Sequence, residues 1–157
     1  MYDRILLPTD GTAGMDGVVR HAAALAATHG AEIHALYVVD TARFSTLPAG
    51  MTWEGLTDMF QTEGERAMDA VERQAGDVPV QRAIVEGRPS TEIGEYARTN
   101  DCDVIVMGTH GRGGIDRLLL GSVAENVIRA ARIPVVTVPV EAADRDPPTD
   151  RREVAAE

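Results

Sequence analysis

The sequence of 157 residues contains no lysine, so all 15 of its basic residues are arginines. Against them stand 25 aspartates and glutamates, which gives a formal net charge of -10. A chain of this charge is poorly suited to the phosphates of nucleic acids or of anionic lipids, and we set both classes of partner aside. An acidic composition without lysine also suits a protein kept soluble in high salt. This composition predicts a halophilic source. A protein that stays fully folded without added salt would contradict that prediction.

Two further absences limit the class of protein. Cys102 is the only cysteine, so no disulfide can form within the chain, and a reducing compartment is expected. No apolar run approaches the roughly 20 residues needed to cross a bilayer, and the N-terminus lacks the layout of a signal peptide. We therefore expect a cytoplasmic protein with no membrane partner.

Strand-like apolar runs alternate with helical repeats along most of the chain. The strand-like runs cover residues 5–7, 31–40, 78–85, 102–108 and 133–140, and the helical repeats cover residues 15–28, 51–74, 91–98 and a stretch from 122. This alternation predicts an α/β fold, a single doubly wound domain whose parallel sheet carries helices on both faces. The domain would span residues 1–140, and the acidic residues 141–157 would form a disordered tail, because they contain almost no core-forming side chains.

The last helical repeat begins with a recognisable start signal. Ser122 is followed three residues later by Glu125, which predicts a capping box at the helix N-terminus. The inward face of this helix is then expected to consist of four apolar residues. These are Val123, Val127, Ile128 and Ala131.

Two loops follow strand-like runs at the edge where parallel sheets bind ligands, Pro-Thr-Asp-Gly-Thr after the first run and a glycine-rich loop after the fourth. The glycine-rich loop is not a P-loop, because that motif requires a lysine. It is not a dinucleotide-binding fingerprint either, because Asp116 stands where the third glycine should be.

The spacing of this loop is Gly108, two residues, Gly111, nine residues, Gly121 and Ser122, a G-x2-G-x9-G-S/T pattern. Together with the Pro-Thr-Asp after the first strand, it resembles the universal stress protein family in its ATP-binding subgroup, over residues 1–140. The resemblance implies a five-stranded sheet in the order 3-2-1-4-5, of the adenine nucleotide alpha hydrolase-like type.

The phosphate side of the site is expected around the glycines. Gly108 ends a strand where the missing side chain would let a ribose or phosphate approach the backbone, and Gly111 begins the turn over the phosphates. Gly121 precedes a helix whose free N–H groups attract an anion without lysine. The resemblance implies that Ser122 and the amide of Val123 contact the terminal phosphates.

The resemblance assigns the rest of the nucleotide to other residues. Asp10 would accept a hydrogen bond from a ribose hydroxyl, while Pro8, Val38 and Met107 would frame the adenine, Val38 through its backbone. From its place inside the loop rather than from the resemblance, Arg112 is expected either to add positive charge near the phosphates or to have a solvated side chain.

Ordinary structural roles stay open for three of the polar residues. Ser122 is explained equally well as a helix cap, and Asp10 as a turn residue. His110 has no second ligand cluster beside it, so a solvent-facing or structural histidine is expected and no metal site is predicted.

The resemblance implies a homodimeric ATP-binding regulator or sensor of the stress response, with Mg2+ arriving with the nucleotide and an unknown protein partner reading its state. The subunits would meet through the last strand, residues Ile133 to Val138. No catalytic residue is assigned, because neither charge neutralisation nor a group that orients water is clearly supplied. Two alternatives stay open: a dimeric scaffold of the same fold that binds no nucleotide, and a slow ATPase.

Overall fold

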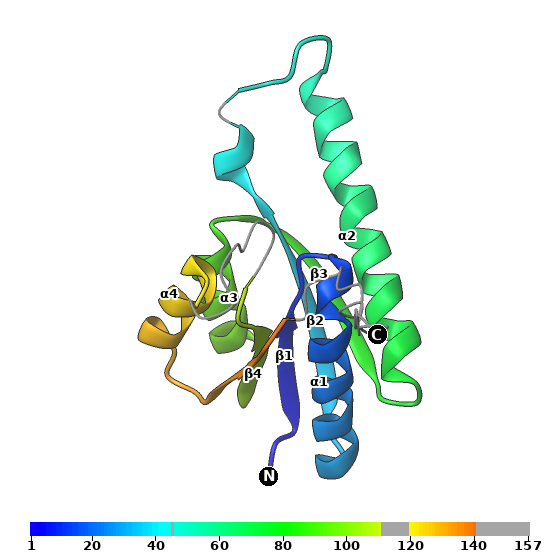
Figure 1. Cartoon of the computed structure of the whole chain (residues 1–157), viewed down its shortest axis with the longest axis vertical. Helices are drawn as coiled ribbons and strands as arrows, with labels where there is room; N and C mark the ends of the chain where they lie inside the picture. The colour runs from blue at the N-terminus through cyan, green and yellow to red at the C-terminus, as the bar shows by residue number, and fades with distance from the viewer. Residues whose placement is uncertain (45, 111–119, 141–157) are drawn as a thin grey trace, which may run out of the picture.

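The computed structural model describes residues 1–44, 46–110 and 120–140. Strands and α-helices alternate through these ranges (Figure 1). In chain order they are β1 Arg4–Pro8, α1 Asp16–His29, β2 Glu32–Asp40, α2 Trp53–Ala75, β3 Val80–Gly87, α3 Pro89–Thr99, β4 Val104–Gly108, α4 Ser122–Ala130 and β5 Val135–Val138. Short 3-10 turns precede α1 at Ala13–Met15 and follow β2 at Thr41–Phe44. The predicted Arg112 and Gly111 positions and the tail 141–157 lie outside the described residues.

The five strands form one parallel sheet in the order β3-β2-β1-β4-β5. The doubly wound α/β fold expected from the sequence is thereby confirmed. The chain first builds outward from β1 through β2 to β3, and then crosses back over the sheet to β4 and β5. The carboxyl ends of β1 and β4 consequently lie side by side at the point where the connections change direction.

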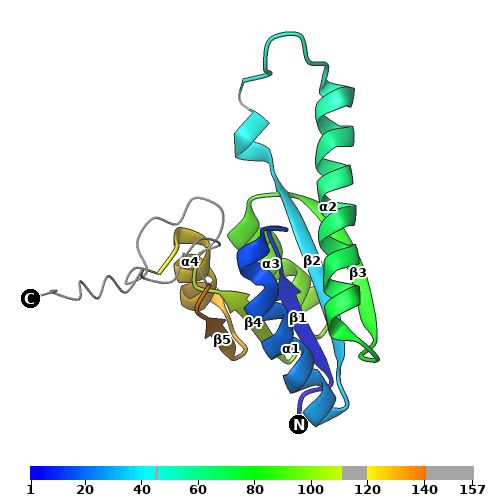
Figure 2. The same cartoon turned by 45° about the vertical axis from the view of Figure 1, so that its right-hand side comes forward.

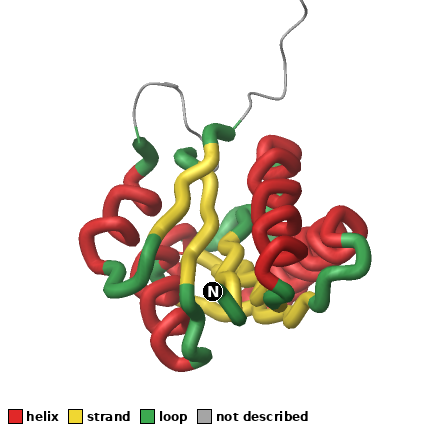
Figure 3. Tube along the Cα trace, turned by 90° about the horizontal axis from the view of Figure 1, so that it is seen from below, coloured by secondary structure: helices red, strands yellow, loops and turns green. Residues whose placement is uncertain are grey.

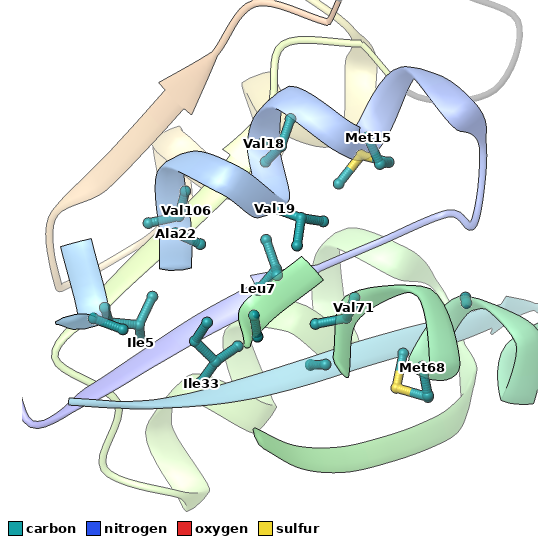
Figure 4. Packing of buried hydrophobic residues seen from close by; sticks show 14 of the residues in the cluster. Ile5, Leu7, Met15, Val18, Val19, Ala22, Ile33, Met68, Val71 and Val106 are labelled. Atoms are coloured by element: carbon teal, nitrogen blue, oxygen red, sulfur yellow. The ribbon is translucent and has the colours of Figure 1, made fainter. Parts of the chain in front are cut away.

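The helices cover the two faces in pairs, α1 with α2 on one face and α3 with α4 on the other (Figure 3). Each strand serves both layers, because successive side chains point to opposite faces. Leu7 packs with the α1 and α2 residues, as Figure 4 shows, whereas its neighbour Leu6 packs with α3 and α4. The central strands β1 and β4 are buried on both faces, as their continuous apolar sequences indicate.

The long helix α2 extends well beyond the sheet that it covers (Figure 2). Its start is capped by Thr52, whose side-chain oxygen accepts a hydrogen bond of 3.0 Å from the amide of Gly55. Its C-terminal half is held to β3 by the guanidinium of Arg82, which bonds to three carboxylates along the helix. These belong to Glu65, Asp69 and Glu72. No helix in the described ranges has the length and apolar character required to span a bilayer.

The expected start and inward face of α4 were partly wrong. Gly121, with extended backbone angles, occupies the cap position, so Ser122 is the first helical residue and the predicted capping box is not formed. The buried residues are Ala124 and Val127, whereas Ile128 is 43% exposed.

Candidate functional site

A cavity of about 350 Å³ lies at the carboxyl ends of β1, β2 and β4, beside the start of α4. Its position follows from the topology: the chain leaves β1 toward α1 on one face and leaves β4 toward α4 on the other. The diverging connections leave a crevice between the two strand ends, where ligands of open α/β sheets bind. A cavity of this volume falls in the range of small-molecule sites.

Every predicted site residue that the structure describes lines this cavity. They are Pro8, Asp10, Val38, Met107, Gly108, Gly121, Ser122 and Val123. These residues come from segments more than a hundred positions apart in the sequence, and the sheet topology brings them together. Gly111 and Arg112 belong to the segment outside the described residues.

The carboxylate of Asp10 is positioned by its own turn. Its Oδ1 accepts hydrogen bonds from the backbone N–H of Thr12 at 2.9 Å and from the Thr12 hydroxyl at 2.7 Å. The preceding residue, Thr9, donates its amide hydrogen to the carbonyl of Leu36 and so ties the turn to β2. The turn role considered from the sequence is therefore real, and it fixes a carboxylate at the wall of the cavity.

The backbone of Val38 faces the same crevice. The carbonyl oxygen of Leu36 accepts a hydrogen bond of 2.9 Å from the amide of Thr9, the residue that follows β1. Alternate residues of a strand direct their N–H and C=O groups to the same neighbour, so those of Val38 also point to the β1 side. Because the pairing of β1 ends at Pro8, opposite Leu36, the polar groups of Val38 point past the end of that strand.

Packing within the protein requires a residue without a side chain at position 108, whereas the sequence argument explained Gly108 by the approach of a ligand. A Cβ atom at this position would lie 2.6 Å from Cγ2 of Val140 and 3.2 Å from the carbonyl oxygen of His110. The missing side chain thus makes room for the chain itself, although Gly108 also lines the cavity. A larger residue here would disturb the backbone, so a substitution of Gly108 is a poor probe of ligand binding.

The start of α4 forms the wall of the cavity farthest from β2. Gly121 donates its amide to the carbonyl of Thr109 at 2.7 Å, and Ser122, Val123 and Ala124 form the first turn of the helix. The N–H groups of a first turn have no partners within the helix and carry the positive end of its dipole. This wall is therefore suited to an anionic group.

His110 also lines the cavity, although the sequence favoured a solvent-facing or structural histidine. Its Nδ1 lies 2.9 Å from the hydroxyl of Thr109, whereas its Nε2 is buried and meets no hydrogen-bonding partner among the described residues. The lone position of this histidine in the sequence gave no signal of a binding role. Its adjacency to Gly108 and Gly111 was the only available signal.

Further lining residues were not predicted from the sequence. They lie on β2, in the turn after it, on α2 and on α3, and include Tyr37, Asp40, Arg43, Phe60 and Ile93. Arg43 supplies a guanidinium group among the described lining residues. None of the described carboxylates lies within salt-bridge distance of this group. Asp40 is the last residue of β2 and Arg43 lies in the turn that follows. Ligands bind at the carboxyl ends of such strands, so the rule used for the other two loops could have found these residues too.

Comparison with known proteins places this geometry in a family. The family model of the universal stress protein family matches residues 1–139. Universal stress protein MJ0531 of Methanocaldococcus jannaschii is 41% identical over 140 residues, which cover 88% of this chain and 82% of that protein.

Solved structures give the same result. The structure of MJ0577, from the same organism, has a TM-score of 0.79 at 30% identity and covers 91% of this chain and 99% of its own. A universal stress protein of Archaeoglobus fulgidus in complex with dAMP has a TM-score of 0.59, covering 87% of this chain and 97% of its own. At 22% identity, that likeness concerns the fold alone. The family model, the sequence relatives and the sheet order agree, and the chain belongs to the universal stress protein family.

Proposed function

We propose that this chain is an ATP-binding universal stress protein that acts as a homodimeric, nucleotide-dependent regulator or sensor of the stress response. One observation carries the proposal: the predicted nucleotide-contacting residues that the structure describes all line a single cavity. Asp10 and Val38 lie outside the glycine motif, so a chance match to the glycine spacing would not by itself bring them into the same cavity.

The walls of the cavity differ in chemistry along the sheet edge in the way that a nucleotide requires. Apolar Val38 and Met107, with the backbone groups of Val38, suit an adenine, and the carboxylate of Asp10 suits a ribose hydroxyl. The first turn of α4, with Ser122 and Val123, suits the phosphates. The described residues therefore fit an adenine nucleotide with its base at β2 and its phosphates at α4.

Mg2+ would arrive with the nucleotide. Within the described ranges, no group of three or more His, Cys, Asp or Glu side chains is arranged to hold a metal ion. The ion would neutralise part of the phosphate charge when bound. A solved universal stress protein with dAMP supports the proposal at the level of the fold, because it holds an adenine nucleotide on the same architecture.

The homodimer would form through β5, as the sequence resemblance implies. β5 is an edge strand, hydrogen-bonded to β4 within the described part of the chain, and its four residues are half-buried. Its free edge offers a row of backbone groups to a second copy.

The proposal is tested on freshly purified protein, kept in high salt because the composition predicts a halophilic source. The protein is denatured, the released small molecules are separated by chromatography, and Mg-ATP is then titrated by calorimetry. We expect about one adenine nucleotide per chain or a saturable binding heat. Absence of both would contradict the proposal and favour the nucleotide-free scaffold.

A matched pair of substitutions locates the site. Gly121→Val places a side chain where the phosphates would lie, and the φ of -64° at Gly121 is accessible to valine. Gly94→Val makes the same change on α3, where no atom lies within 4 Å of the added Cβ. We expect ATP binding to be lost in the first variant and kept in the second. Equal affinities in the two variants would place the site elsewhere.

A further inference from the structure

A hydrogen bond to the Thr109 hydroxyl orients the His110 ring. The Thr109 hydroxyl oxygen accepts a hydrogen bond from the amide of Val140 at 3.4 Å and lies 2.9 Å from Nδ1 of His110. The amide of Val140 occupies one of the two lone pairs of this oxygen, and we assign the single hydroxyl hydrogen to the bond with Nδ1, which is then the acceptor. In this assignment the ring hydrogen of the His110 imidazole lies on Nε2.

Nε2 is consequently a buried N–H donor. No described residue provides an acceptor for it, and the ring lines the cavity. A buried donor without a partner is destabilising, and native structures rarely keep one unless a ligand, water or ion completes the bond. An acceptor from a bound molecule would remove this cost.

The position of the ring within the cavity indicates which part of the nucleotide supplies that acceptor. The carbonyl of Thr109, the residue before His110, accepts the amide of Gly121, so the two residues adjoin the start of α4. The base end of the cavity, at Val38 on β2, is separated from this region by β1. The nearest negatively charged atoms of a bound nucleotide would be phosphate oxygens.

We propose that His110 is a phosphate-recognition residue, whose Nε2–H donates a hydrogen bond to an oxygen of the phosphate chain held at the start of α4. Thr109 is the positioning residue that sets the ring orientation and tautomer. The inference rests on the proposed nucleotide function and adds a donor that the glycine motif does not include. In a chain without lysine, it supplies a further N–H donor for phosphate recognition.

The test compares ligands that differ only in their phosphates. Adenosine, AMP, ADP and ATP, the last two with Mg2+, are titrated into wild type, His110→Phe and His110→Gln. His21→Phe, an exposed histidine on α1, serves as the control. We expect His110→Phe to weaken ATP binding about ten-fold or more and to leave adenosine binding unchanged, because the lost bond involves a charged acceptor. His110→Gln keeps an N–H donor near Nε2 and should recover most of the affinity.

Two results would overturn the assignment to the phosphates. One is an ATP affinity in His110→Phe equal to that of wild type and His21→Phe. The other is an equal loss for adenosine and ATP, which would indicate a change in the shape of the cavity. If wild type itself binds none of the four ligands, the proposed function fails and this inference fails with it. A wild type that binds ATP but ignores the substitution contradicts the inference alone.

The tautomer supplies a readout that does not depend on affinity. Long-range proton–nitrogen spectra of histidine-labelled protein distinguish an Nε2–H ring from an Nδ1–H ring, and His110→Gln identifies the signal. We expect the Nε2–H form before ligand is added, and a shift of that nitrogen on addition of Mg-ATP that adenosine does not produce. An Nδ1–H ring, or equal shifts with both ligands, would contradict the assignment.

Discussion

The amide nitrogen of Gly121 donates a hydrogen bond of 2.7 Å to the carbonyl oxygen of Thr109. This bond joins the two ends of the segment between β4 and α4, which carries the glycine motif. Thr109 also donates its own amide to the carbonyl of Val138, at the end of β5. One residue therefore joins β4, β5 and the start of α4. The geometry of the phosphate end of the cavity depends on this junction.

Thr109→Val should reduce both stability and ATP affinity. Valine has nearly the same shape but removes the hydroxyl that lies between the amide of Val140 and Nδ1 of His110. Loss of these bonds should cost about 1–2 kcal/mol in the free energy of unfolding, measured by urea denaturation. Thr109→Ser keeps the hydroxyl and is the control. If Thr109→Val behaves as Thr109→Ser does in both assays, the hydroxyl is not the positioning group.

The free edge of β5 can be tested at one residue. Ile105 on β4 donates its amide to the carbonyl of Pro134, just before β5, and Thr109, just after β4, donates to the carbonyl of Val138. Every second residue along this segment therefore directs its backbone groups to β4. Thr137, between those positions, directs its N–H to the free edge. Thr137→Pro removes that donor and leaves the bonds to β4 intact.

If the homodimer forms through this edge, Thr137→Pro should be monomeric by sedimentation while Thr137→Val stays dimeric. Binding of ATP should persist in both variants. A Thr137→Pro protein that sediments as a dimer would show that the subunits meet through another surface.

Two helical glycines should respond in opposite directions to alanine. Gly94 on α3 has no atom within 4 Å of an added Cβ, so Gly94→Ala should raise the free energy of unfolding by about 0.5–1 kcal/mol through helix propensity. At Gly64 on α2, the Cβ would lie 2.9 Å from Cδ1 of Ile84 and 3.1 Å from Cδ1 of Tyr37. Gly64→Ala should therefore lower stability, because the buried ring of Tyr37 and the side chain of Ile84 must shift to make room. Thermal and urea unfolding of both variants would measure this, and equal gains would show that α2 is not closely packed there.

The carboxylate of Asp103 should make stability depend on pH. The backbone N–H groups of Arg4 and Asp3 donate to its Oδ2 at 2.9 and 2.8 Å, which holds the pKa of this carboxyl below its ordinary value of 3.8. A lowered folded-state pKa means that the stabilisation is complete above the unfolded-state value and is lost as the pH falls through the folded-state value.

Asp103→Asn should accordingly be less stable than wild type at pH 7, and the difference should shrink as the pH falls below about 4. The neighbouring Asp101→Asn is the control, because the side chain of Asp101 is 88% exposed. Urea unfolding at several pH values measures the effect. A difference between Asp103→Asn and wild type that stays constant from pH 7 to pH 3 would contradict the assignment.

The sequence predicted most of the fold because its signals were local and consistent. Buried runs such as Val104–Gly108 read as central strands, and Gly30, with a φ of 67°, ends α1 as its position after a helical repeat suggested. The order of the strands came from the family resemblance rather than from the pattern. The described site residues were brought together because they follow strands whose carboxyl ends meet at one edge.

The errors came from contacts that a sequence does not display. Ile128 and Ala124 are both apolar, and the sequence alone does not show that Ala124 is buried and Ile128 exposed. Gly121 takes the cap position from Ser122 because its backbone is bonded to Thr109, a long way back along the chain. The contacts around His110, through the hydroxyl of Thr109 to the amide of Val140, likewise follow no spacing rule in the sequence.

The length of α2 implies that one helix contains two levels of local stability. Its 23 residues span about 35 Å, whereas the eight residues of β3 span about 26 Å. From Gly64 onward the buried side chains recur along the helix, but before Gly64 the buried side chain is that of Leu56. Amide hydrogens in the first turns of α2 should therefore exchange with solvent through local opening, and those of the later turns only when the whole domain unfolds. Phe60, which lines the cavity, lies at the boundary between the two regimes, so a bound ligand should move that boundary toward Thr52.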